Sequence, residues 1–136
     1  MSTHAFERHT HEVRVHLEGE SFDHLFLEGA RAIAELVGTP SQDPPGPWQH
    51  VSVEAQDRSR LLVVWLNELI SRSDVDHLIY ADAEIDELTA NRIDARIRGV
   101  PIGQVGVGLG VATSHALELA PVGETLSATI TVETRG

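Results

Sequence analysis

The sequence contains no cysteine and no lysine. Without cysteine the chain has no disulfide framework, no thiolate metal site and no cysteine nucleophile. Without lysine it has neither Schiff-base chemistry nor a phosphate loop that depends on a lysine. Its apolar runs, such as residues 61–66, are far shorter than a membrane span, and its first residues lack a signal-peptide pattern. We therefore expect a soluble, cytoplasmic protein without membrane contact.

Basic residues are scarce as well, since 21 Asp and Glu stand against 10 arginines and give a formal net charge of −11. A field of this sign repels phosphate backbones, so we expect no direct, extensive binding of nucleic acid. The same charge favours cations or a basic partner protein. With 136 residues and 41% apolar composition, the chain predicts a single domain over residues 1–136.

Two segments have the apolar spacing of a helix. In residues 22–36 apolar side chains recur every three or four positions, with Ser21 as the N-cap and Gly38 as the stop. Residues 61–70 repeat this pattern after Asp57, and they place Trp65 on the buried face. The prolines of residues 39–47 predict an irregular loop between the helices, because proline lacks the donor that regular structure uses.

Half-buried strands are indicated where apolar and polar residues alternate, in residues 12–18, 51–55, 77–86, 88–98, 111–119 and 126–132. The third and fourth segments predict a hairpin, and residues 121–124 predict the turn that leads into the last strand. This order of elements is typical of an α+β fold, in which two helices pack on a largely antiparallel β-sheet.

Three motifs carry chemistry-bearing residues. His9 and His11 are separated by one residue and are followed by Glu12, so they are either metal ligands of a small hydrolase or exposed neutral histidines. The glycine-rich residues 103–110 lack the G-x-G-x-x-G spacing, and we expect a flexible connection there. Arg92, Arg96 and Arg98 form a stripe on one strand face. We expect this face to be solvated and balanced by neighbouring acids rather than to contact RNA.

Four segments, taken in order, resemble the archease family across essentially the whole chain. Residues 6–13 resemble the family's N-terminal Phe-x-x-x-x-His-Thr-Ala-Asp-Val-Gly type of opening, and residues 61–70 its central Leu-Asn-Glu-Leu helix. Residues 110–117 are similar to its late Lys-Ala-Val-Thr-Tyr-His segment, and the last strand up to Thr134 to its ending. We expect Asn67 and Glu68 to be structural, with Asn67 satisfying backbone groups at a helix–sheet junction.

The resemblance implies an archease-like fold and a non-catalytic accessory protein. Such a protein activates or chaperones a tRNA-splicing RNA ligase, promoting its guanylylation and turnover. It also implies a site for a divalent cation, Ca²⁺ or Mg²⁺, formed here by Glu12 and Glu133 in place of two aspartates. The alternatives are a metal-dependent hydrolase that uses His9, His11 and Glu12, or a cation-binding module without a ligase role.

The chain departs from the family pattern at several positions. The family's lysine falls at Gly110 and its tyrosine at Ser114. In the N-terminal opening, Ala-Asp-Val-Gly has become His11, Glu12, Val13 and Arg14. Because these changes lie at the positions that the resemblance marks as functional, the sequence carries more information about the fold than about the activity.

Overall fold

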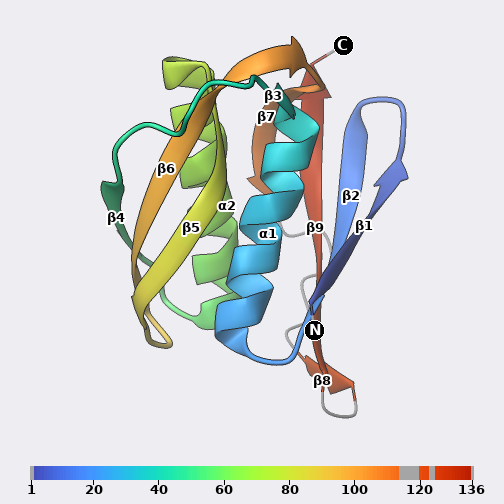
Figure 1. Ribbon diagram of the computed structural model, residues 1–136. Helices are drawn as coiled ribbons and strands as arrows, with labels where there is room; N and C mark the ends of the chain where they lie inside the picture. Colours follow the sequence, from blue (N-terminus) through green and yellow to red (C-terminus); the bar gives the residue numbers. More distant parts are fainter. Residues whose placement is uncertain (1, 114–119, 123–124, 136) are drawn as a thin grey trace.

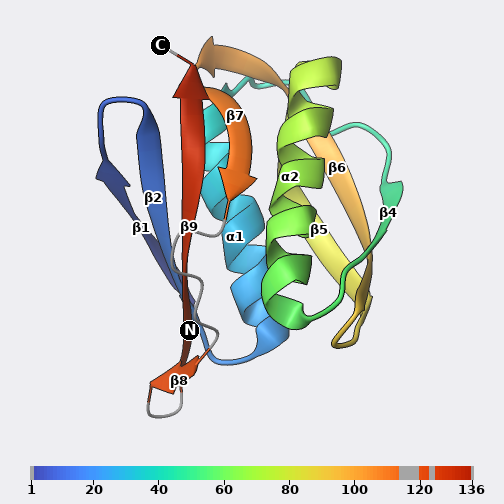
Figure 2. The same ribbon diagram turned by 180° about the vertical axis from the view of Figure 1, so that it is seen from behind.

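The computed structural model describes residues 2–113, 120–122 and 125–135. Two helices, α1 (Phe22–Val37) and α2 (Arg58–Asp76), stand side by side between two antiparallel sheets (Figures 1 and 2). The α+β class is therefore confirmed, although strands cover the helices on two sides. No helix in the described part of the chain is long and apolar enough to cross a bilayer.

The first sheet has β2 and β9 at its centre. Its strand order is β1 (Thr3–Arg8), β2 (Glu12–Gly19), β9 (Thr125–Arg135) and β7 (Gly108–Thr113), and the short β8 (Ala120–Val122) also pairs with β9. The second sheet is built on β6 (Arg92–Val105), which pairs with β3 (Gly38–Pro40), β4 (Gln49–Glu54) and β5 (Leu78–Leu88). The pairing of β5 with β6 confirms the predicted hairpin.

Both helices begin at the N-caps that the sequence indicates. The Ser21 hydroxyl accepts a hydrogen bond from the backbone N–H of His24 at 3.1 Å, and the Asp57 carboxylate accepts one from the N–H of Arg60 at 2.8 Å. Each cap satisfies a donor that has no partner within the helix. α1 ends at the predicted Gly38, whose φ of 157° is readily adopted only by glycine.

Two expectations for the connecting segments hold only in part: residues 41–47 are irregular as predicted, but other parts of both segments lie in strands. The predicted loop 39–47 begins inside β3, where Pro40 pairs with Ile102, and proline is tolerated because β3 is a short strand at a sheet edge. The glycine-rich residues 103–110 lie mostly in β6 and β7 rather than in a flexible connection. Glycine is needed there for close packing, because a Cβ at Gly106 would lie 2.5 Å from the carbonyl oxygen of Leu36.

The last predicted hairpin is formed by β8 and β9, and two of the predicted turn residues belong to a strand instead. Pro121 and Val122 belong to β8 and pair with Leu126 and Thr125 of β9. The predicted strand 111–119 is described as far as Thr113, and its remainder lies outside the described residues, as do turn residues 123 and 124. Strands β1, β3 and β8 were not expected from the sequence.

One hydrophobic core joins the helices to both sheets. Trp65 of α2 is fully buried in it, and its indole Nε1 donates a hydrogen bond to the carbonyl oxygen of Phe26 in α1 at 3.0 Å. The strands of the first sheet contribute alternate residues to this core, namely Val13, Val15 and Leu17 of β2 and Ala128, Ile130 and Val132 of β9. The intervening residues of β2 and β9 consequently point away from the core.

Asn67 joins α2 to β7, as expected. Its side-chain amide donates to the carbonyl oxygen of Ala112 at 2.9 Å and accepts from the Ala112 N–H at 2.7 Å. The neighbouring Glu68 accepts a hydrogen bond from Arg72, one helical turn later, at 2.7 Å. Asn67 therefore supplies both hydrogen bonds to a strand residue beside an irregularity in the β7–β9 register.

The arginine stripe of β6 lies on a solvated sheet face: Arg96 and Arg98 are paired with acids from β5, and Arg92 with Asp94 and Glu54. Arg96 Nη2 lies 2.7 Å from Glu84 Oε2, and Arg98 Nε lies 2.8 Å from Asp82 Oδ2. The guanidinium of Arg98 also stacks 4.6 Å from the ring centre of Trp48. This face thus has the balanced charge that the sequence indicated.

Strand β1 is attached to α1 by a cluster of polar side chains. The two ring nitrogens of His4 contact the carboxylates of Glu28 and Glu35, and Glu28, only 4% exposed, also accepts from Ser2 at 2.7 Å and from Arg31 at 3.1 Å. Burial opposes protonation of His4, but the hydrogen bonds with the carboxylates outweigh it and raise the pKa of His4. Burial raises the pKa of Glu28, but its hydrogen bonds outweigh this and lower it.

The His4 contact predicts a pH-dependent stability. Because the folded-state pKa of His4 is raised, its contribution is complete below the unfolded value of about 6.5 and is lost as the pH rises through the folded value. We expect a His4→Gln variant to lack this loss when the free energy of unfolding is measured from pH 5 to 9. The exposed His24→Gln is the control, and parallel curves for wild type and His4→Gln would contradict the assignment.

Candidate functional site

Glu12 and Glu133 lie directly opposite each other on β2 and β9. Their chain neighbours, Val13 and Val132, face the core, so the two carboxylates are carried on the outer side of the sheet. The β1–β2 turn closes with a hydrogen bond from His9 N to Glu12 O at 2.9 Å. The register therefore places the two glutamates opposite each other on adjacent strands, as expected.

An open pocket surrounds this pair and is lined by His9, Thr10, His11, Glu12, Glu133 and Thr134. The structure thus gathers the histidines and the glutamates of both hypotheses at one end of the first sheet. His9, however, turns its Nε2 towards Glu7 at 3.1 Å. In the described part of the chain, no three histidine, aspartate or glutamate side chains come together as a group that could hold a metal ion.

Arg14, on the same outer face of β2 as Glu12, supplies positive charge beside this pair. Its Nη2 lies 3.9 Å from Glu12 Oε1 and its Nη1 lies 3.5 Å from Glu7 Oε2. From the sequence, Arg14 was only a departure from the family pattern, and its contact with Glu12 was not predicted. The signal was its position, because residues two apart on a strand point to the same face. An arginine here reduces the repulsion between the carboxylates and competes with an external cation.

Gly110 of β7 completes the surroundings of Glu133. A Cβ built at Gly110 would lie 3.3 Å from Glu133 Oε2. The position at which the resemblance puts the family's lysine is therefore in contact with one of the two carboxylates. The position of its tyrosine, Ser114, lies outside the described residues.

This pocket offers oxygen donors of the kind that hard divalent cations bind, with two carboxylates rather than a group of three. Ca²⁺ and Mg²⁺ bind carboxylates and hydroxyls, and water fills the positions that protein ligands leave open. Glu12 and Glu133 would hold the ion here, and Thr10 and Thr134 offer hydroxyls in the same pocket. Such an ion would neutralise the two opposed carboxylates.

Two sheets around a helix pair, with carboxylates where β2 and β9 meet, define a small α+β protein whose polar pocket is built from strand ends. Residues 4–133 match the Archease protein family (MTH1598/TM1083), and the chain belongs to this family. A Protein archease from Methanopyrus kandleri is 29% identical over 98 residues, which cover 71% of this chain and 68% of the relative. A Protein archease from Pyrobaculum neutrophilum is 25% identical over 127 residues, covering 88% and 86%.

Two solved structures have the same fold. Protein 1598 of Methanobacterium thermoautotrophicum, determined in solution, aligns with a TM-score of 0.75 at 20% identity and covers 96% of this chain and 97% of that chain. The crystal structure of an archease from Thermotoga maritima, described as a possible chaperone, aligns with a TM-score of 0.69 at 16% identity and covers 93% of each chain. At these identities the likeness establishes the fold.

Proposed function

We propose that this protein is a cytoplasmic accessory protein that activates an RNA ligase of the tRNA-splicing type and does not itself catalyse a reaction. Membership of the archease family supports this proposal, as does the description of the Thermotoga maritima relative as a possible chaperone. The observation that carries it is the opposition of Glu12 and Glu133. These carboxylates stand where the resemblance places the family's functional pair.

Charge supports a protein partner over direct contact with RNA. The net charge of −11 repels phosphates, whereas a ligase that binds RNA and a nucleotide has a basic surface around them. An acidic accessory protein is attracted to such a surface, and this attraction speeds its association. In this arrangement the ligase binds the nucleotide and the RNA, and the accessory protein binds the ligase.

Guanylylation of the ligase tests the proposed activity. We expect that adding the wild-type protein to the ligase from the same source increases the amount of guanylylated ligase and the number of ligation turnovers. Glu12→Gln and Glu133→Gln should reduce the stimulation, because they remove charge from the opposed pair. Glu54→Gln, which changes an exposed carboxylate of β4, is the matched control. A ligase that responds equally with and without the protein would refute the proposal.

The same pair is proposed to bind Ca²⁺ or Mg²⁺ when the protein acts. A shared cation removes the repulsion between the carboxylates, and at a hundredfold excess over its dissociation constant it stabilises the fold by about 2.7 kcal/mol. In calorimetric titrations we expect Glu12→Gln to bind more weakly than wild type. Arg14→Gln should bind more tightly, because a charge 3.9 Å from Glu12 is gone.

Lower cation affinity in Glu12→Gln and higher affinity in Arg14→Gln would distinguish binding at the pair from binding to a diffuse acidic surface. A diffuse surface would lose the same affinity in Glu12→Gln and Glu54→Gln. Failure of wild type to bind either ion up to millimolar concentration would refute the cation site and leave the ligase proposal to the fold alone.

Zn²⁺ in the same titration tests the alternative function. Tight Zn²⁺ binding that disappears in His11→Ala, together with ester hydrolysis, would favour the hydrolase.

A further inference from the structure

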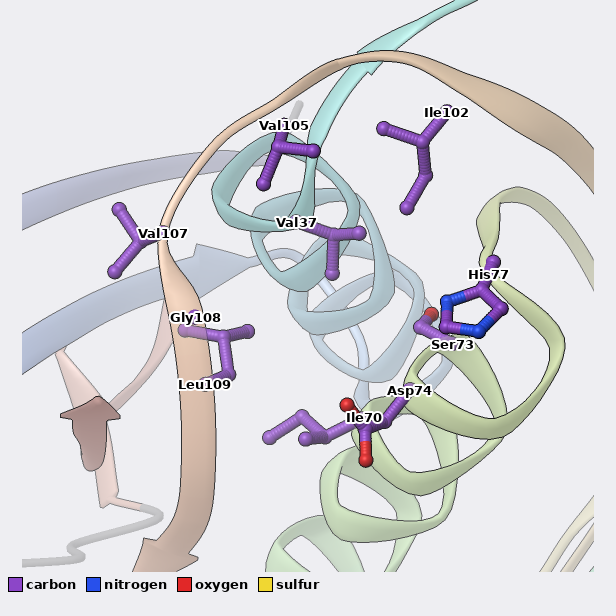
Figure 3. A pocket seen from close by; sticks show the side chains of 10 residues that line it. All are labelled: Val37, Ile70, Ser73, Asp74, His77, Ile102, Val105, Val107, Gly108 and Leu109. Carbon is purple, nitrogen blue, oxygen red and sulfur yellow. The ribbon is translucent and has the colours of Figure 1, made fainter. Parts of the chain in front are cut away.

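A second depression opens between the C-terminal ends of α1 and α2 and the beginning of β7 (Figure 3). Its volume is about 180 Å³. Its walls are mainly aliphatic and comprise Val37, Ile70, Ile102, Val105, Val107 and Leu109. The polar side chains of Ser73 and Asp74 in α2 and of its C-cap residue His77 lie along one side. We call this depression the apolar cavity.

The apolar cavity has the size and chemistry for one apolar side chain. An engineered apolar cavity of roughly 150 Å³ in another protein stays dry and accepts benzene, so a branched aliphatic or aromatic group fits the volume here. Val105 is 76% exposed at its edge although the side chain is fully apolar. Covering such surface with another apolar group is favourable at about 25 cal/mol per Å².

The apolar cavity adjoins the pocket of Glu12 and Glu133. Leu109 lines the cavity, and its partner across the β7–β9 ladder, Thr134, lines the carboxylate pocket. The next pair along the ladder is Gly108 with Arg135. The Nη1 of Arg135 reaches Asp74 Oδ1, on the cavity wall, at 3.5 Å. The apolar cavity thus lies on the helix side of the β7–β9 pair and the carboxylates on its outer side, and Arg135 reaches from β9 to Asp74 near the edge strand β7, around which the two depressions adjoin.

The charges around these two depressions select a basic occupant. Glu12, Glu133 and Asp74 face them. Arg135 balances Asp74 in an exposed ion pair at 3.5 Å, and Arg14 lies 3.9 Å from Glu12 in a half-buried one. Such pairs contribute little stability and are readily exchanged for a partner's cation. Large aromatic side chains and arginine are also enriched among the residues that contribute most to the energy of protein interfaces.

We propose that the apolar cavity and the carboxylate pocket form one docking surface for a segment of the partner ligase. The segment places an apolar side chain in the cavity and an arginine or lysine against the carboxylates. This inference rests on the proposed function, because the ligase is the partner considered there. It adds the surface of this chain that the ligase contacts and the kind of segment that fits it.

A charge placed at the cavity edge tests the docking surface. Val105→Asp puts a carboxylate where the apolar anchor enters, and we expect it to weaken binding of the ligase about tenfold or more in calorimetry. Val75→Asp is the matched control, because Val75 is 73% exposed on α2 and does not line the cavity. We expect it to change the affinity less than twofold. Thermal unfolding of both variants verifies that each remains folded.

The outcomes separate this inference from the proposed function. Weaker binding by Val105→Asp alone supports the docking surface. Equal binding by wild type, Val105→Asp and Val75→Asp would overturn the docking surface while the ligase remained the partner. Equal weakening by both variants would also overturn it, because added negative charge anywhere would then suffice. If the ligase does not bind the wild-type protein, the proposed function fails and the docking surface fails with it.

Discussion

Replacing Trp65 by alanine is expected to lower the free energy of unfolding by about 3–5 kcal/mol, as large-to-small changes of buried aromatic residues do. The side chain is fully buried between α1, α2 and the sheets, and its loss leaves a cavity that the neighbouring residues fill only in part. The change also leaves the Phe26 carbonyl without the indole donor 3.0 Å away. Chemical denaturation followed by circular dichroism measures the difference.

Trp48→Ala is the control for this prediction. It removes the same side chain from the surface, where Trp48 is 37% exposed and stacks on Arg96 and Arg98. Surface substitutions usually change stability by about 0.5 kcal/mol or less, and the lost arginine contacts add about 0.5–1 kcal/mol at an exposed site. Similar losses in the two variants would show that Trp65 does not hold the core together.

Asn67→Ala is expected to cost about 2–4 kcal/mol of stability, because it leaves a buried donor and a buried acceptor of Ala112 without partners. Ala112 is 1% exposed, so water does not replace the amide. The loss separates α2 from β7 locally, and the Ala112 amide should exchange its hydrogen much faster than in wild type. Denaturation and hydrogen exchange together measure this effect.

The matched control is Asn91→Ala, in the turn between β5 and β6. Asn91 also donates to backbone carbonyls, to Gln56 at 2.8 Å, but it is exposed. Water can satisfy the groups that it leaves, so we expect a loss of about 1 kcal/mol. A loss for Asn67→Ala no larger than this would contradict the role of Asn67 at the helix–sheet junction.

The helices were predictable because their signals are local. Ser21 and Asp57 each accept a hydrogen bond from the backbone N–H three residues later. Gly38 adopts a positive φ that residues with a side chain rarely adopt. Trp65 was assigned to the core from spacing alone, since every third or fourth residue of a helix shares a face. None of these interactions depends on which strand lies beside which.

Strands β1 and β3 were not predictable in the same way. β1 is an edge strand with mostly exposed residues, and Pro40 in β3 argues against regular structure. Their pairing comes from partners far along the chain, such as Val105 for Gly38. Gly106, between β6 and β7, is explained by its close contact with the end of α1, and Gly110 by its contact with Glu133; periodicity reveals neither contact.

By itself the sequence determined the class of fold, the two capped helices and the acidic character of the molecule, because spacing, capping and charge act within a few residues. Resemblance then singled out Glu12 and Glu133. Only the tertiary structure decided that they lie opposite each other, that Arg14 reaches Glu12 and that Gly110 contacts Glu133. The register of β2, β9 and β7 sets these contacts, and register depends on the burial of alternate residues against both helices.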